Sequence, residues 1–186
     1  MPEPTRVRKI AVVGSRAVGK SSMIVQFVEE HFVESYYPTI ENQFNKTIKI
    51  RGQEYNVEIL DTAGQDEFSI INQKHLIGVD GFILAYSVTN RSTFEMVSII
   101  YDKILNYSGA DSVPAVIVGN KTDLELQRQV SEEEGKALAD ELKCGFTETS
   151  ARLNEHVSKA FELLVMAIEK KNNPKAVQEA KGCTIM

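Results

Sequence analysis

Short apolar runs alternate along the chain with stretches in which apolar residues recur at helical spacing. Residues 10–13, Ile-Ala-Val-Val, form a continuous apolar run, which is typical of a strand covered on both faces. Similar runs predict buried strands at 81–87, 115–119 and 145–149. Because helical patterns separate these strands, the order predicts an α/β fold with a mostly parallel sheet and helices on both of its faces.

A β-hairpin is expected between residues 44 and 60. Polar and apolar positions alternate over 44–50 and over 55–60, and the turn between them contains Arg51-Gly52. Two such strands pair antiparallel. The predicted sheet therefore has six strands, mostly parallel, with one antiparallel edge strand.

Helices are predicted at 20–29, 92–107, 131–142 and 155–171. The last of these has one apolar face, made of Val157, Ala160, Phe161, Leu164 and Ile168. Ser131 followed by Glu134 is typical of a capping box. Residues 31–42 show neither helical spacing nor strand-like alternation, so this stretch is predicted to be a long loop. We expect a single domain over 1–171 and a flexible polar tail over 172–186.

Composition and charge exclude several classes of protein. The 186 residues include 21 Lys+Arg and 26 Asp+Glu, and a net charge of −5 argues against nucleic-acid binding. Apolar runs are far shorter than the ~18 residues of a membrane span, and residues 1–9 lack a signal-peptide core. Two cysteines build no disulfide framework, and Cys144 is expected to be a small buried hydrophobe. His31, His75 and His156 show no metal-ligand spacing.

Residues 14–21, Gly-Ser-Arg-Ala-Val-Gly-Lys-Ser, match the phosphate-binding pattern GxxxxGK[ST] between a predicted strand and a predicted helix. The glycines let backbone N–H groups surround a phosphate at the positive end of the helix. Lys20 adds a cation for the terminal phosphates, and the Ser21 hydroxyl suits Mg²⁺. The alternative is an ordinary glycine turn, which leaves the complete match unexplained.

Residues 120–123, Asn-Lys-Thr-Asp, follow a predicted strand at the sheet edge where ligands bind in such folds. The Asp123 carboxylate can accept hydrogen bonds from N1–H and the 2-amino group of guanine. Adenine offers neither donor and would leave a desolvated charge unpaired. The pattern therefore indicates guanine; the alternative is a turn that caps the strand.

The segments GSRAVGKS, YPTIEN, DTAGQDEF, NKTD and ETSA occur in this order and spacing. The chain thereby resembles the Ras superfamily of small GTPases, whose fold is the P-loop NTPase G domain. Arg16, Asn42 and the last four residues, Cys-Thr-Ile-Met, resemble the Rheb subfamily in particular. The resemblance covers residues 6–171 and the last four residues. It implies a switch that binds GTP or GDP with Mg²⁺ and hydrolyses GTP.

The resemblance implies a role for each matching position. The implied nucleotide-binding residues are Arg16, Ala17, Val18, Gly19, Lys20, Ser21, Ser22, Phe32, Val33, Tyr36, Thr39, Gly64, Asn120, Lys121, Asp123, Ser150 and Ala151. The implied Mg²⁺ ligands are Ser21 and Thr39, with Asp61 holding a metal-bound water. The implied catalytic residues are Gln65, Tyr36 and Arg16. The implied effector region is Tyr36, Tyr37, Pro38, Thr39, Ile40, Glu41 and Asn42.

The roles implied for Thr39 and Gly64 would make two loops depend on the bound nucleotide. Thr39 can reach Mg²⁺ only if its loop closes, and Gly64 can turn its N–H toward a γ-phosphate without a Cβ in the way. Because both loops depend on one phosphate, its loss is expected to release 31–42 and 61–72 together.

The chain departs from the usual Ras pattern at Arg16 and Ala17, where glycines are common. A side chain at Arg16 leans over the γ-phosphate region, where the attacking water and a partner's arginine have to fit. Gln65 matches the glutamine that orients this water, and we expect Arg16 to crowd it and slow hydrolysis. The resemblance implies that the partner supplies an asparagine in place of the arginine.

The last four residues form a C-a-a-X box of the farnesyl type, with Cys183 as the modified residue. Residues 169–186 carry four lysines and two glutamates, so their attraction to anionic lipids is weak. One prenyl chain is then expected to anchor the protein reversibly to a membrane. We expect the protein at the cytoplasmic face of internal membranes, exchanging with the cytosol. By the resemblance, its partners are a TOR-type kinase complex, a tuberin-type GAP and farnesyltransferase, and it acts as a monomer.

Two other functions stay open at this point. One is a scaffold that holds GTP with negligible turnover, which single-turnover hydrolysis would distinguish. The other is a P-loop kinase or ATPase, which Asn120 and Asp123 argue against and which competition between ATP and GTP would test.

Overall fold

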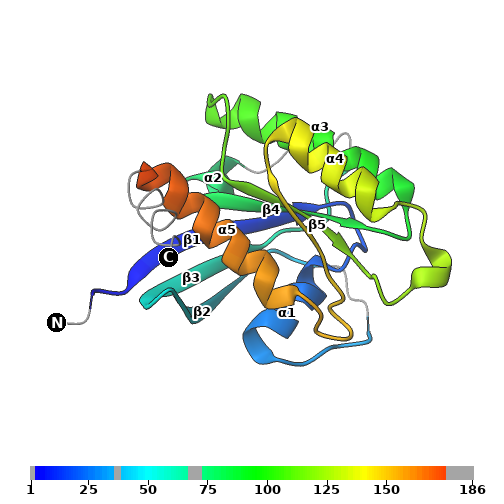
Figure 1. Ribbon diagram of the computed structural model, residues 1–186, viewed down its shortest axis with the longest axis horizontal. Coiled ribbons are helices and arrows are strands. Elements are labelled where there is room, and N and C mark those ends of the chain that lie inside the picture. The colour runs from blue at the N-terminus through cyan, green and yellow to red at the C-terminus, as the bar shows by residue number, and fades with distance from the viewer. Residues whose placement is uncertain (1–2, 36–38, 67–72, 175–186) are drawn as a thin grey trace, which may run out of the picture.

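The computed structural model describes residues 3–35, 39–66 and 73–174 (Figure 1). At its centre is a six-stranded sheet with the order β2-β3-β1-β4-β5-β6. The strands are β1 (Arg6–Gly14), β2 (Asn42–Ile50), β3 (Gln53–Asp61), β4 (Gly81–Ser87), β5 (Ala115–Asn120) and β6 (Gly145–Glu148). Neighbouring strands are parallel except for the β2–β3 pair, which confirms the predicted mostly parallel sheet with its antiparallel edge strand.

The predicted hairpin is present, and its strands are longer than the alternating pattern indicates. The register runs from Ile50 opposite Gln53 to Asn42 opposite Asp61. Arg51 (φ 50°) and Gly52 (φ 85°) are both left-handed, as a two-residue hairpin turn of type I′ requires. The extension of β3 carries Asp61 to the carboxyl end of the sheet, next to the end of β1.

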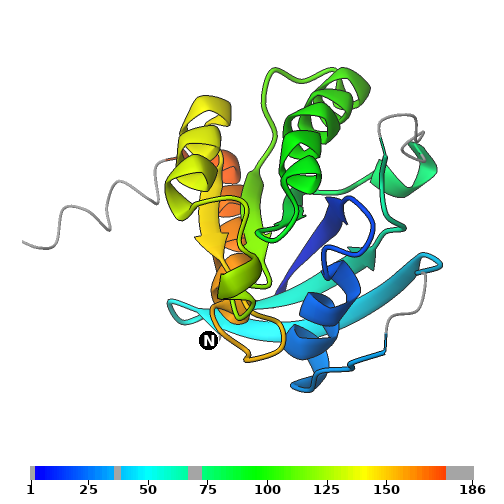
Figure 2. The same cartoon turned by 90° about the vertical axis from the view of Figure 1, so that its right-hand side faces the viewer.

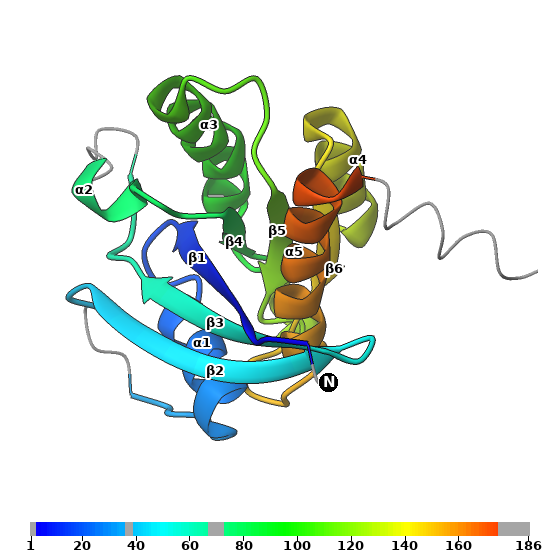
Figure 3. The same cartoon turned by 90° about the vertical axis from the view of Figure 1, so that its left-hand side faces the viewer.

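Helices cover both faces of the sheet, as predicted (Figures 2 and 3). The helices are α1 (Lys20–Glu29), α2 (Gln73–Leu76), α3 (Arg91–Ser108), α4 (Glu132–Leu142) and α5 (Val157–Asn172). Residues of α1 and α5 belong to one hydrophobic cluster, and those of α3 and α4 belong to the other. The four-residue helix α2 and the 3-10 turn Glu125–Gln127 escaped the sequence pattern because neither is long enough to show a period.

The central strands supply both clusters by alternation. Ile10 and Val12 of β1 face α1 and α5, whereas Ala11 and Val13 face α3 and α4. The predicted apolar face of α5 is confirmed, since all five of its residues are buried. Phe161 of this face stacks on Phe27 of α1 with ring centroids 4.0 Å apart, which joins the first and last helices.

The structure also bears on the expected capping box, on Cys144 and on the histidines. The capping box is present: Ser131 Oγ accepts from Glu134 N at 3.2 Å, and Glu134 accepts from Ser131 N at 2.9 Å. Cys144 is partly buried against the α3/α4 cluster, and this burial raises the pKa of its thiol. His31 and His156 are exposed, whereas the side chain of His75 lies outside the description.

Within the described ranges, no group of three or more His, Cys, Asp and Glu side chains could hold a metal ion, and no helix is long and apolar enough to cross a bilayer. Helix α5 ends at Asn172, and residues 175–186 lie outside the described residues. The boundary between domain and tail near residue 171 therefore stays a prediction.

Candidate nucleotide-binding site

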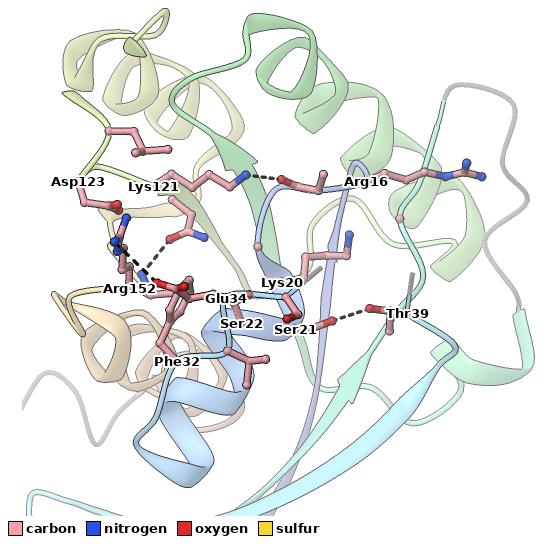
Figure 4. A pocket seen from close by; sticks show the side chains of 18 residues that line it. Arg16, Lys20, Ser21, Ser22, Phe32, Glu34, Thr39, Lys121, Asp123 and Arg152 are labelled. Carbon is pink, nitrogen blue, oxygen red and sulfur yellow. Dashed lines mark hydrogen bonds and ion pairs between the residues drawn. The ribbon is translucent and has the colours of Figure 1, made fainter. Parts of the chain in front are cut away.

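A cavity of about 570 Å³ opens at the carboxyl ends of β1, β3 and β5 (Figure 4). It is lined by residues from the loops that follow these strands and β6, from the start of α1 and from the segment after α1. The lining residues are Arg16, Ala17, Gly19, Lys20, Ser21, Ser22, Phe32, Val33, Glu34, Ser35, Thr39, Gly64, Asn120, Lys121, Asp123, Leu124, Ala151 and Arg152.

The loop between β1 and α1 has the backbone conformation that a phosphate-binding loop needs. Gly19 has φ 94° and immediately precedes α1, and a Cβ at this position would collide with the side-chain amide of Asn120. Ala17 is also left-handed, with φ 59°, a conformation that glycine adopts without the steric cost of a Cβ. The strand, loop and helix thus occur in the predicted order and leave the first N–H groups of α1 directed at the cavity.

Lys20 is a buried cation beside this loop. Its Nζ donates to the carbonyl oxygens of Gly14 at 3.0 Å and Ser15 at 2.8 Å. Burial lowers the pKa of Lys20 to about 8, although the nearby Asp61 carboxylate acts in the opposite direction. An anion in the cavity would further favour the charged ammonium, because an opposite charge stabilises it.

Three oxygen-bearing side chains lie close together at the end of the cavity that Ser21 and Thr39 line, with Asp61 beside Ser21. Ser21 Oγ lies 2.6 Å from Thr39 Oγ1, although the two residues come from different segments. Asp61 Oδ1 is buried without a hydrogen-bond partner. Burial raises the pKa of Asp61, and the Ser21 hydroxyl and the Lys20 ammonium partly offset this effect. Two hydroxyls beside an unsatisfied carboxylate oxygen fit Mg²⁺, a cation that prefers oxygen ligands.

At the opposite end of the cavity, Asn120 joins three loops. Its Nδ2 donates to the Val18 carbonyl at 2.9 Å, and its Oδ1 accepts from Thr149 Oγ1 at 3.1 Å and Ala151 N at 3.3 Å. The side chain is buried, and the second hydrogen of its amide nitrogen is available to a ligand. Asn120 therefore positions the loops as well as lining the cavity.

Asp123 is oriented by a neighbouring serine. Ser150 Oγ donates to Asp123 Oδ1 at 2.8 Å, and Leu153 N donates to Ser150 Oγ at 3.0 Å. The other carboxylate oxygen, Oδ2, is left to accept donors from a base in the cavity. Ser150 is fully buried and outside the cavity lining, so it acts through Asp123.

Lys121 connects the two ends of the cavity. Its Nζ donates to the carbonyl of Ala17 at 2.6 Å, so its stem spans the space between Asp123 and the phosphate-binding loop (Figure 4). Burial lowers the pKa of Lys121, and Asp123 opposes this shift. A flat ligand such as a base can pack on the aliphatic stem.

Arg16 and Gln65 are held near each other by the backbone. Gln65 N donates to Gly14 O at 2.8 Å, and Gln65 Nε2 donates to Ala63 O at 2.9 Å. A Cβ on Gly64 would collide with Arg16, so glycine is required between them. Arg16 is exposed, and its side chain extends away from Lys20 in Figure 4. The expected crowding of Gln65 by Arg16 stays a prediction.

Most of the predicted nucleotide-binding residues surround one cavity. Val18 and Ser150 are buried behind it, and Asp61 and Gln65 lie outside its lining.

Four other predicted residues lie outside the described residues: Tyr36, Tyr37, Pro38 and Cys183. Of the effector region, Ile40 is 89% exposed. Arg152, whose stem the sequence places near the base, lines the cavity. The sequence analysis missed Glu34, Ser35 and Leu124. Leu124 adjoins the predicted Asp123, which is the signal that could have found it.

Comparisons with known proteins agree with this geometry. The Ras family model matches residues 9–170. The chain is 62% identical over 182 residues to GTP-binding protein rhb1 of Schizosaccharomyces pombe, a match that covers 98% of each chain. It is 58% identical to the small monomeric GTPase RhbA of Aspergillus fumigatus and 46% identical to the GTP-binding protein Rheb of Homo sapiens, in both cases over 100% of each chain. The chain therefore belongs to the Ras family of small GTPases, close to Rheb, and is a GTP hydrolase.

Proposed function

We propose that this small GTPase switch holds GTP or GDP with Mg²⁺, hydrolyses GTP slowly, and in its GTP form activates a growth-control kinase complex of the TOR type. The observation that carries the nucleotide assignment is the convergence of Lys20, Asn120 and Asp123 on one cavity. A cation and N–H groups at one end suit phosphates, and a carboxylate at the other end suits guanine. The separation of these two ends by the Lys121 stem matches an elongated nucleotide.

In this proposal, the residues of the cavity divide by the part of the nucleotide that they bind. Lys20 and the backbone from Ala17 to Ser21 bind the β- and γ-phosphates, and Ser22 contacts the α-phosphate. Phe32 packs edge-on to the base, and the backbone at Val33 faces the ribose. Ala151 N–H, which also bonds Asn120 Oδ1, is placed for the guanine O6.

Ser21 and Thr39 would hold Mg²⁺, with Asp61 acting through a bound water. The ion would supply positive charge that offsets the phosphates. The contact between Ser21 and Thr39 supports this assignment, because it already joins the loop before β2 to the start of α1. When the γ-phosphate is lost, the Thr39 and Gly64 contacts to it are lost as well, and both segments are free to change conformation.

The partners are proposed from the likeness to the Rheb proteins and from the surface of the effector region. The exposed Ile40 gives an apolar contact point beside Thr39, so a partner bound there would respond to the state of the phosphate site. We propose a TOR-type kinase complex as the effector, a tuberin-type GAP as the accelerator of hydrolysis, and farnesyltransferase as the enzyme that modifies Cys183.

Replacing Asp123 with Asn tests the guanine assignment. An amide cannot accept both guanine donors, so GTP affinity should fall on the order of 10²-fold or more. Xanthosine triphosphate should gain affinity, because its ring has a carbonyl where guanine has the amine. Competition binding of both nucleotides to parent and variant measures this. Unchanged GTP affinity without any gain for the xanthine nucleotide would refute the assignment.

Replacing Ser21 with Asn tests the proposed metal ligand. The variant lacks a hydroxyl beside the phosphates, so it should bind GTP more weakly and favour GDP or the nucleotide-free state. Affinities for GTP and GDP are measured with Mg²⁺ and with a chelator. If parent and variant depend on Mg²⁺ to the same extent, Ser21 is not a ligand.

Arg16 and Gln65 are tested together by single-turnover GTP hydrolysis. Displacing a catalytic group by ~1 Å can cost on the order of 10²-fold in rate, so crowding alone would make unassisted hydrolysis slow. We expect Arg16→Gly to speed hydrolysis at least modestly and Gln65→Leu to have less effect than in a Ras-type site. The exposed position of Arg16 supports the opposite view, in which Gln65 works normally. That view is correct if Arg16→Gly changes nothing while Gln65→Leu removes nearly all activity.

The lipid anchor is tested by replacing Cys183 with Ser. The variant should incorporate no prenyl group and move from membranes to the cytosol, with GTP binding unchanged. Cys144→Ser is the matched control, because it removes the other cysteine and should leave membrane association intact. Membrane association of the Cys183→Ser protein at the parent level would rule out this anchor.

A further inference from the structure

One ion pair crosses the base end of the cavity. Arg152 Nη2 lies 3.8 Å from Glu34 Oε1. Figure 4 shows the two side chains reaching toward each other from different segments, between the labelled positions of Asp123 and Phe32. Arg152 follows the base-binding residue Ala151, and Glu34 belongs to the segment 31–35 after α1. Both residues line the cavity, and neither has a role in the function proposed above.

The Arg152 side of this pair is firmly held. Gln26 Nε2 of α1 donates to Ala151 O at 2.9 Å, and Ala151 N donates to Asn120 Oδ1 at 3.3 Å. Ser150 and Glu155 exchange backbone hydrogen bonds at 3.1 and 3.0 Å, which closes the loop on itself. These contacts fix the backbone on both sides of Arg152.

The Glu34 side is held much less. Phe32 packs against the α1/α5 cluster, while Val33, Glu34 and Ser35 are exposed. Within the described residues, the pair with Arg152 is the one hydrogen bond or ion pair that joins 31–35 to the loop 150–155. A separation of the two walls would therefore move residues 31–35 and would break this pair.

We infer that the Arg152–Glu34 ion pair slows dissociation of the bound nucleotide by holding residues 31–35 against the base-binding loop. The inference rests on the function proposed above. The base lies between Asp123 and Ala151 on one wall and Phe32 on the other, so it leaves when these walls separate. Thr39 is hydrogen-bonded to Ser21 at the metal end, and Glu34 is ion-paired with Arg152 at the base end. The ion pair does not depend on the γ-phosphate, so it retains GDP as well as GTP.

The exposure of the Arg152 and Glu34 side chains sets how much the ion pair slows nucleotide dissociation and how strongly this depends on salt. The side chains are 56% and 81% exposed, and surface pairs of this kind change an equilibrium or a rate by about 2- to 5-fold. Salt screens exposed pairs, since the Debye length falls from ~10 Å at 0.1 M to ~3 Å at 1 M. Raising the salt concentration should therefore remove the contribution of the pair.

The experiment measures dissociation of a fluorescent GDP analogue, chased by excess GDP, from the full-length protein. Glu34→Gln and Arg152→Met each remove one charge while keeping the approximate side-chain length. Each should speed dissociation about 2- to 5-fold at low salt, and the double variant should be no faster than either single one. Glu34→Arg combined with Arg152→Glu reverses the pair and should restore slow dissociation. At 1 M salt, the parent should reach the rate of the variants.

Lys136→Gln is the matched control. It breaks an ion pair with Glu132 whose side chains are 60% and 51% exposed and which lies on α4, outside the cavity lining. The inference is overturned if the Glu34 and Arg152 variants release the analogue at the rate of this control. It is also overturned if their effects multiply in the double variant or persist at 1 M salt. If the parent does not hold the analogue at all, the proposed nucleotide function fails with it.

Discussion

The hydrogen bonds of the Asn120 side chain hold the ligand-binding loops together. One buried amide donates to the phosphate-binding loop at Val18 and accepts from Thr149 and Ala151 of the base-binding loop. These loops follow different strands, so their relative position depends on the order of β1, β5 and β6 in the sheet. Leaving such a buried amide unpaired costs about 1–3 kcal/mol per group. The phosphate end and the base end of the cavity are therefore parts of one bonded unit.

The segment between α1 and β2 contacts this unit through weaker interactions. Thr39 touches Ser21 at the metal end, and Glu34 faces Arg152 at the base end. The residues that Asn120 bonds, Val18, Thr149 and Ala151, are buried, whereas residues 33–35 and Ile40 are exposed. A region with few buried contacts opens at a lower free-energy cost than the core. In the function proposed above, a rigid binding site is combined with a segment whose position depends on the γ-phosphate, which is what a switch requires.

The amino-acid sequence predicts the regular parts of this structure because they depend on local patterns. Continuous apolar runs identify the central strands, and the GxxxxGK[ST] pattern identifies the loop before α1. Helix α2 is too short to show a period, and the extension of β3 to Asp61 depends on pairing with β2. Within the site, sequence motifs name Asn120 and Asp123. They do not indicate that Glu34 and Arg152 face each other, because this contact arises only when two distant loops meet.

The central claim is that the cavity around Lys20, Asn120 and Asp123 is a guanine-nucleotide site. The most direct measurement is the nucleotide content of the purified protein, released by denaturation and identified by chromatography. A site with both ends fixed in this way should retain its ligand through purification, so the account predicts a stoichiometric amount of GDP or GTP. Protein that is correctly folded but carries no nucleotide, or carries an adenine nucleotide, would contradict it.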